Sequence, residues 1–392
     1  MPNKRGQNEG SFDQMENGTW RGRITVGVGT QGKQKRKSFY GKTRKEVQLK
    51  VTQALNQINT GTYIETTNMT VAQWLDIWFT EYILPSVKHA THVNYDGIIH
   101  KHINPHLGHI KLADLRTDTI QSFYNAKSLN GRADGRGGLS PKSVKNIHSM
   151  LHKALDQALD NGLIAKNPSN AISLPKPKKT REMRVLTPDE HRQLVANSYD
   201  HDHGLVIRLA LETGLRIGEL LGLQWSDIDF TDSSLTIKRT INRLKSFDPN
   251  STTKTVVVVS EPKTKNSLRT IPLSSTMLAE LTQHRQAQER IIKQAYIFIN
   301  SNQNPFEARR MQKIFKDILH WAELKDINFH ALRHTFATRA LEANVPAKVV
   351  SEMLGHANIS ITLDTYSHVS LDSKRTALEQ MNNYINSNSD FG

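Results

Sequence analysis

Residues that can bind anions and move protons stand in short strings in the C-terminal half of the chain. His330 and Arg333 are three residues apart, so a helix would place both on one face. Guanidinium groups such as those of Arg216 and Arg333 suit bidentate contacts to phosphate oxygens, and histidine titrates near neutrality, which fits proton transfer. Attack on a phosphodiester builds negative charge on its nonbridging oxygens, so fixed cations there lower the barrier. These residues predict phosphoryl-transfer chemistry.

Each residue taken alone has an ordinary interpretation. Arg216 could be any helix arginine, the pattern His330-x-x-Arg333 occurs by chance in many proteins, and a tyrosine such as Tyr366 more often packs in a core. The ordered combination, behind a basic multi-domain body, resembles the tyrosine recombinase family and its phage integrases, well over residues 70–385 and loosely over 1–65. The strings that carry the resemblance are TGLRIGELLGLQWSDID (213–229), EPKTKNSLRTIPL (261–273), HALRHTFATRALEANV (330–345) and LGHANISITLDTYSHV (354–369).

The resemblance implies a role for each matching residue. Tyr366 would be the nucleophile that attacks the scissile phosphate, leaving a 3′-phosphotyrosine link and a free 5′-hydroxyl. Arg216 and Arg333 would clamp the phosphate. His330 would exchange a proton with the tyrosine hydroxyl, and His356 would form a hydrogen bond to the phosphate.

A lysine completes the implied set as the general acid for the leaving 5′-oxygen. Lys263 matches the lysine of the family's hairpin. Lys265 would point to the same face of a strand, so both lysines remain candidates. An apparent insertion, KSFDPNSTTK (245–254), separates two predicted strands upstream.

The composition predicts catalysis without metal or cofactor. The chain has no cysteine, which excludes disulfides, thiolate zinc sites and cysteine nucleophiles. It offers neither the clustered carboxylates of a two-metal nuclease nor a GxxxxGK[ST] motif for ATP. Under the resemblance, the phosphotyrosine bond itself conserves the energy needed for rejoining.

The charge points to a polyanionic partner. The net charge is +15, and residues 1–68 hold 12 Lys/Arg against 5 Asp/Glu. We expect residues 1–65 to form an arm-site DNA-binding domain with a small β-sheet, from strands at 20–28 and 33–40, and a helix. Thr43 is the expected N-cap of that helix, and Glu46 completes a capping box.

Basic side chains on the predicted strands are candidate DNA contacts, with a solvated edge strand as the alternative. We expect one strand face to enter a groove with Arg21, Arg23, Lys35 and Lys37.

Three further regions follow along the chain. Residues 70–172 predict an all-α core-binding domain, with helices over 71–84, 91–103, 117–129 and 140–162. Residues 173–183 combine prolines with basic residues as a linker along the phosphate backbone, with Lys176, Lys178 and Lys179 as candidate contacts. Residues 184–392 predict a mainly α catalytic domain with a small antiparallel sheet and a C-terminal tail. The predicted fold class is thus multi-domain α+β, the tyrosine recombinase fold.

The expected partner is double-stranded DNA with core and arm attachment sites, bound by a tetramer. An excisionase and a host DNA-bending protein are further possible partners. The chain shows no signal peptide and no membrane span, so we expect a cytoplasmic protein, associated with the nucleoid when bound to DNA. Integration and excision of a phage or other mobile element is the favoured function. The alternatives are a chromosome-dimer recombinase, a type IB topoisomerase and a DNA-binding regulator that kept the fold.

Overall fold

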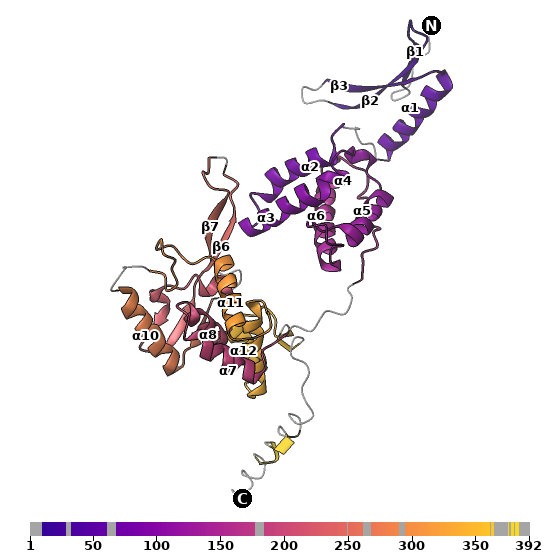
Figure 1. The fold of residues 1–392 in the computed structure, drawn as a ribbon. Helices are drawn as coiled ribbons and strands as arrows, with labels where there is room; N and C mark the ends of the chain where they lie inside the picture. The colour runs from indigo at the N-terminus through magenta and orange to yellow at the C-terminus, as the bar shows by residue number, and fades with distance from the viewer. Residues whose placement is uncertain are drawn as a thin grey trace, which may run out of the picture. The chain divides into compact units, whose positions relative to one another are not determined.

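The computed structural model divides the chain into two compact units, residues 1–180 and 181–392, called here the N-terminal and C-terminal units (Figure 1). The division falls within the basic segment 173–183. The residues that the structure describes are 10–28, 33–60, 68–176, 184–248, 250–261, 268–289, 295–360, 362–363, 375, 378–379 and 381–383. Within these ranges, no helix has the length and apolar character needed to cross a membrane.

The N-terminal unit begins with a three-stranded antiparallel sheet and a helix that packs on one of its faces. The elements are β1 (Ser11–Gln14), β2 (Trp20–Val28), β3 (Gln34–Gly41) and α1 (Arg44–Asn59). Ile24, Val47 and Val51 form the centre of this small core. A Cβ on Gly22 would lie 2.7 Å from both valines, so glycine is what lets α1 approach the sheet closely. Strand β1 is an addition to the two strands that the sequence predicts.

The strand register corrects the expectation that four basic residues share one DNA-binding face. Lys37 lies opposite the buried Ile24, so Lys37 and Lys35 are on the side of the sheet that faces α1. Arg21 and Arg23 alternate with Ile24 and lie on the opposite side of the sheet, away from α1. The prediction was wrong because the sequence does not reveal the register, and one residue of shift moves a side chain to the other face.

The cap of α1 also differs from the expected capping box. The Thr43 hydroxyl accepts a hydrogen bond from the backbone N–H of Glu46 at 3.2 Å, as predicted for an N-cap. The Glu46 carboxylate, however, accepts from the N–H of Lys42 at 3.0 Å, one residue before the cap. Lys42 directly follows β3, and its N–H takes the bond that a capping box gives to the N-cap residue.

The second part of the N-terminal unit is all helical. Its α-helices are α2 (Val71–Trp78), α3 (His89–Ile98), α4 (Asn104–Leu107), α5 (Thr117–Asn130) and α6 (Pro141–Asp160). The first two predicted helices each end in a π-helical turn, at Phe79–Ile83 and Ile99–Ile103. Trp74 from α2 anchors the core by donating from its indole nitrogen to the Ala154 carbonyl of α6, 2.8 Å away.

In the C-terminal unit the buried helix α8 packs against α7, α9 and α12, and the unit also contains two small sheets. Its helices are α7 (Pro188–Ser198), α8 (Gly204–Thr213), α9 (Ile217–Leu220), α10 (Ser275–Glu289), α11 (Ala308–Trp321), α12 (His330–Glu342) and α13 (Ala347–Leu354). Its strands are β4 (Ile228–Asp229), β5 (Ser234–Ile237), β6 (Thr240–Lys245), β7 (Thr255–Ser260) and β8 (Arg269–Pro272).

The strands of this unit pair as two separate antiparallel sheets. One has the order β4-β5-β8 and contributes Leu235 and Ile271 to the core, directly opposite each other. The other is the β6–β7 hairpin, which extends from the body of the unit in Figure 1. The stretch SLTIKRTI (234–241) is therefore divided between the two sheets, since it supplies all of β5 and the start of β6.

Candidate active site

Arg216 is placed by a tight turn between α8 and α9. Gly214 ends α8 in the left-handed conformation, with φ 64°, and a Cβ there would stand 2.6 Å from Phe336 and Leu354. Glycine is therefore required for conformation and for space. Arg216 is the N-cap of α9, where its backbone N–H and its Nη1 both donate to Glu219, at 3.0 and 2.9 Å.

The Glu219 carboxylate is buried between two arginines. Arg269 at the start of β8 donates from Nη2 to Glu219 Oε2 at 3.0 Å. Burial raises the pKa of Glu219, but the hydrogen bond and charge of Arg269, followed by those of Arg216, bring the pKa below its ordinary value. Glu219 is therefore ionised at neutral pH and fixes the side chain of Arg216.

Arg333 joins three elements at the centre of the site. It lies on α12 and is 3% exposed. Nη1 donates to the Gly214 carbonyl at 2.9 Å, and Nη2 donates to the Leu354 carbonyl at 2.7 Å. The guanidinium thus links the end of α8, α12 and the end of α13, which fixes its position.

His330 begins α12, one turn before Arg333. The residue is exposed, yet its ring packs edge-on against His334 with centroids 4.7 Å apart. Partial loss of water around the ring, and then the charges of Arg333 and Arg216, lower the pKa of His330, although Glu219 acts in the opposite direction. His330 is therefore neutral at pH 7 in the DNA-free protein and able to accept a proton.

His356 follows the end of α13. Gly355 closes that helix with φ 64°, and His356 Nδ1 then lies 2.8 Å from the hydroxyl of the buried Thr362. Burial, followed by the charges of Arg333 and Arg216, lowers the pKa of His356 to about 4. A neutral His356 whose Nδ1 accepts from Thr362 carries its hydrogen on Nε2, where it can donate to an anion.

A polar cavity of about 630 Å³ opens beside these residues. His356 and Arg269 line it from one side, and Lys348 and Ser351 of α13 line it from another. The polar lining of this cavity is suited to a charged group, and the cavity adjoins the site through His356 and Arg269.

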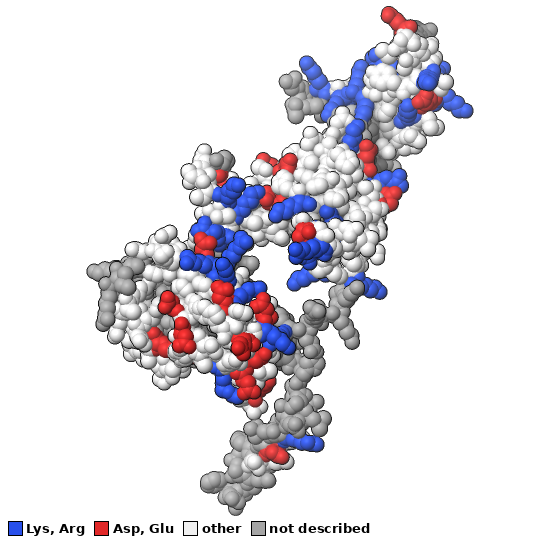
Figure 2. Space-filling model, in the orientation of Figure 1, with Lys and Arg blue, Asp and Glu red and all other residues white. Residues whose placement is uncertain are grey.

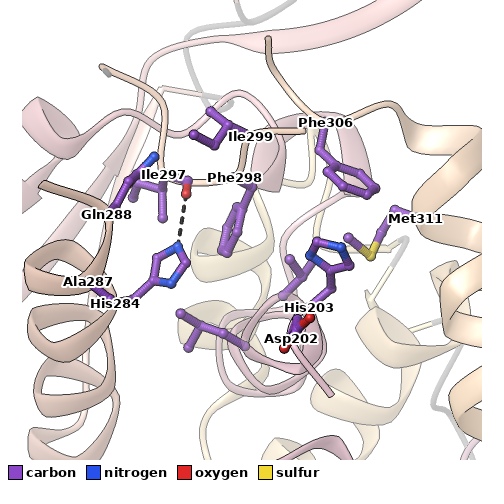
Figure 3. A pocket seen from close by; sticks show the side chains of 12 residues that line it. Asp202, His203, His284, Ala287, Gln288, Ile297, Phe298, Ile299, Phe306 and Met311 are labelled. Carbon is purple, nitrogen blue, oxygen red and sulfur yellow. Dashed lines mark hydrogen bonds between the residues drawn. The ribbon is translucent and has the colours of Figure 1, made fainter. Parts of the chain in front are cut away.

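A second, mainly apolar cavity of about 250 Å³ lies elsewhere in the unit (Figure 3). Phe298, Phe306 and Met311 line it together with two histidines, and the ring of His284 is tied to the Ile297 carbonyl, 3.0 Å away. Of the residues predicted for phosphoryl transfer, the four that the structure describes, Arg216, His330, Arg333 and His356, do not line this cavity. The polar cavity beside His356 is therefore the better candidate for chemistry.

The structure brings four of the six predicted catalytic residues together. Arg333 donates to the carbonyls of Gly214 and Leu354, two residues before Arg216 and His356 respectively, and His330 lies one turn before Arg333 on α12. Lys176 is described and exposed. Five predicted residues lie outside the described part of the chain: Lys178, Lys179, Lys263, Lys265 and Tyr366.

The sequence interpretation missed the residues that support this group. Glu219 had a detectable signal, because it stands three residues after Arg216 and would share its helix face. His334 stands four residues after His330 and had the same kind of signal. Arg269 and Thr362 had none, because their partners are distant in sequence or belong to an irregular segment.

The arrangement suits an anionic phosphodiester. Two guanidiniums supply fixed positive charge, and two neutral imidazoles supply a proton acceptor and a hydrogen-bond donor. Both histidines have lowered pKa values partly because of the neighbouring cations, so an anion bound among them would favour protonation.

Comparisons with known proteins agree with this chemistry. The Phage integrase family model matches residues 184–372, and the model of the N-terminal SAM-like domain of phage integrases matches 70–128. A tyrosine recombinase XerC-like protein of Caldanaerobacter subterraneus subsp. tengcongensis is 34% identical over 92% of this chain and 94% of its own length. The ICEBs1 integrase of Bacillus subtilis (strain 168) is 26% identical over 74% of this chain and 77% of its own length.

A solved structure shares the fold. The Tn1549 transposon integrase in complex with a circular intermediate DNA superposes with a TM-score of 0.65 at 23% identity, over 80% of this chain and 99% of that one. The chain belongs to the phage integrase family of tyrosine recombinases, the site-specific enzymes that break and rejoin DNA strands.

Proposed function

We propose that Tyr366 is the nucleophile of strand exchange and that the described cations form its phosphate site. The Tyr366 oxygen attacks the scissile phosphorus while His330 accepts the phenolic proton. The bond from phosphorus to the 5′-oxygen breaks, and Lys263 or Lys265 protonates the departing oxygen. A 5′-hydroxyl attacking the 3′-phosphotyrosine reverses these steps and joins strands, with no net change in phosphodiester bonds.

One observation carries the proposal: the buried Arg333 guanidinium donates to the Gly214 carbonyl, two residues before Arg216, and to the Leu354 carbonyl, two residues before His356, while His330 lies one turn away on the same helix. The arginines would bind the nonbridging oxygens, and His356 would donate to one of them from Nε2. The backbone anchors of Arg333 and the carboxylate anchor of Arg216 keep both groups in place before DNA binds, so little reorganisation is needed.

A covalent-adduct experiment tests this assignment and selects the attachment site at the same time. Duplexes with a randomised core and a nick near the expected cleavage point are incubated with the full chain in EDTA, and covalently captured DNA is recovered and sequenced. Repeated rounds yield a preferred duplex. We expect a denaturant-stable adduct with this duplex, linked through Tyr366.

Tyr366→Phe is the matched control, because it removes only the nucleophilic oxygen. It should bind the selected duplex and form no adduct. Failure of the unsubstituted chain to form an adduct in any round, or an adduct that survives in Tyr366→Phe, would reject the proposed function.

For the biological role, we infer integration and excision of a mobile element by a tetramer. Exchange between two duplexes requires four strand cleavages, hence four tyrosines. The 26% identical relative named as an integrase supports this role. The XerC-like name of the 34% identical relative makes chromosome-dimer resolution a second candidate.

Each region of the chain would have its own part in this role. Residues 1–65 would bind arm sites, 70–172 and 184–392 would hold the core site, and 173–183 would connect them. Specific binding of a second DNA sequence outside the core favours integration, whereas recognition of the core sequence alone favours the second candidate. An excisionase would assist excision, a host DNA-bending protein would assist recombination, and DNA binding would place the enzyme on the nucleoid.

A further inference from the structure

Arg269 is a buried arginine that no step of the proposed reaction uses. Its side chain is 7% exposed, and Nη2 and Nη1 lie 3.0 and 3.4 Å from the two oxygens of Glu219. The second arginine on this carboxylate, Arg216, is 42% exposed at its side chain. One buried carboxylate therefore holds two guanidiniums, of which only that of Arg216 reaches the surface.

The remaining nitrogen of the Arg269 guanidinium binds the end of α13. Nε donates to the Met353 carbonyl at 2.6 Å, and the next carbonyl, that of Leu354, accepts from Arg333 at 2.7 Å. The last carbonyls of a helix have no partner within the helix, and cations stabilise that end. Two buried arginines thus fix the end of α13 directly before Gly355 and His356.

Charge balance gives Arg269 a second effect on the site. With Arg269 in place, Glu219 and its two arginines carry a net charge of +1, so the positive charge of Arg216 is not cancelled. Without Arg269, Glu219 and Arg216 would form a neutral pair. Glu219 would then draw the Arg216 guanidinium away from an incoming phosphate, because an unbalanced buried carboxylate is strongly unfavourable.

From this geometry we propose that Arg269 is a positioning residue for strand cleavage, acting through Glu219 on Arg216 and through the Met353 carbonyl on His356. The inference rests on the proposed function, since it concerns the same phosphate site. Arg269 contacts elements that lie far apart in the sequence, 50 residues from Glu219 and 84 from Met353. It therefore sets the relative position of two strings that each contribute to the site.

A second buried pair in the same unit provides a control for a purely structural role. Arg208 of α8 donates from Nε to Glu280 of α10 at 2.7 Å, with side chains 12% and 16% exposed. The Arg208 guanidinium also stacks 3.9 Å from the centre of the Tyr199 ring. This pair resembles the Arg269–Glu219 pair in chemistry and burial, but its hydrogen bonds, ion pair and ring contact involve none of Arg216, His330, Arg333 and His356, the catalytic candidates within the described ranges.

The test compares Arg269→Gln and Arg269→Lys with Arg208→Gln in the full chain, on the duplex selected by adduct formation. Three quantities are measured for each variant: the single-turnover rate of adduct formation at saturating DNA, the Kd for the duplex in a Tyr366→Phe background, and the Tm. Rate and Kd together separate a defect in geometry from a defect in binding or folding.

We expect Arg269→Gln to slow adduct formation about 10²-fold with an unchanged Kd, because misplacement of fixed groups by about 1 Å has effects of this size. Arg269→Lys should restore part of the rate, since an ammonium group balances Glu219 but cannot reach both acceptors. Arg208→Gln should lower the Tm and leave the rate of the folded enzyme unchanged.

An Arg269→Gln enzyme that cleaves at the unsubstituted rate would overturn the inference, and so would one whose rate falls no further than that of Arg208→Gln. Should Arg269→Gln not fold, Arg269→Lys decides: slower cleavage at unchanged Kd supports the inference, and a rate equal to that of the unsubstituted chain rejects it. Absence of any adduct from the unsubstituted chain rejects instead the proposed function.

Discussion

Two carboxylates in this chain each bind two arginines, in very different surroundings. On the N-terminal sheet, Asp13 receives Arg21 and Arg23 at 3.1 and 3.3 Å, and the three side chains are 28–40% exposed. In the C-terminal unit, Glu219 receives Arg216 and Arg269 and is 8% exposed. The same ionic arrangement thus occurs once half-buried on a sheet and once in a protein interior.

Burial decides what each arrangement can do. Ion pairs that water reaches contribute little to stability and are screened by salt, so we expect the arginines on Asp13 to exchange that carboxylate for a DNA phosphate. A buried carboxylate cannot lose its partners so easily. We therefore propose reversible DNA contact for the first cluster and a fixed catalytic geometry for the second. Basic side chains are prominent on the visible face of the N-terminal sheet and α1, whereas both signs of charge mix on the C-terminal unit (Figure 2).

The largest predicted effect is that of removing the buried carboxylate. Glu219→Ala leaves Arg269 buried without its counter-ion and should lower the free energy of unfolding by about 3 kcal/mol, as measured by urea denaturation. Asp13→Ala is the matched substitution on the N-terminal sheet and should leave the unfolding midpoint unchanged. Equal losses in the two variants would show that burial does not distinguish the clusters.

Lowering the pH should have a smaller effect on folding stability. This effect also distinguishes the N-terminal sheet from the C-terminal unit, because residues 1–65 contain no histidine. Burial lowers the pKa values of His334 and His356 to about 4, from an ordinary value of 6.5. Between these values the unfolded chain binds protons that the folded chain does not, so stability falls as the pH falls from about 6.5 to 4. The Tm should therefore drop between pH 7 and pH 5, and less in His334→Asn. An identical drop in that variant would contradict the assignment.

The smallest effect concerns the two faces of the N-terminal sheet. Because α1 covers the side that carries Lys35 and Lys37, we expect the opposite side to meet arm-site DNA. In the double variant Arg21→Ala, Arg23→Ala, the DNA-binding constant should depend less on salt. The slope of its logarithm against the logarithm of the salt concentration should fall in magnitude by about 1.8, which is about 0.9 for each lost phosphate contact. The paired Lys35→Ala, Lys37→Ala variant should change the slope less. Fluorescence anisotropy over a salt series measures both, and the reverse ranking would place DNA on the other face.

Local signals account for what could be predicted about the elements. Thr70, Ser140 and Thr187 cap helices where their side chains can accept the first free N–H groups, and all three do so. Gly214 likewise ends α8 in the left-handed conformation that glycine adopts readily. The third strand of the N-terminal sheet, β1, was not predicted, because four residues, SFDQ, show no alternation long enough to recognise.

The sequence by itself determined the class of chemistry. The arginines, histidines and tyrosine of a phosphate site stand in recognisable motifs, and the order of these motifs can be read without a structure. It also determined most helices, because caps and apolar spacing are local properties of the chain. Only the tertiary structure decided that Arg269 shares Glu219 with Arg216 and that two arginines fix the end of α13. The contacts of Arg269 join residues 50 and more positions apart, and their strength comes from burial, which no local pattern in the sequence records.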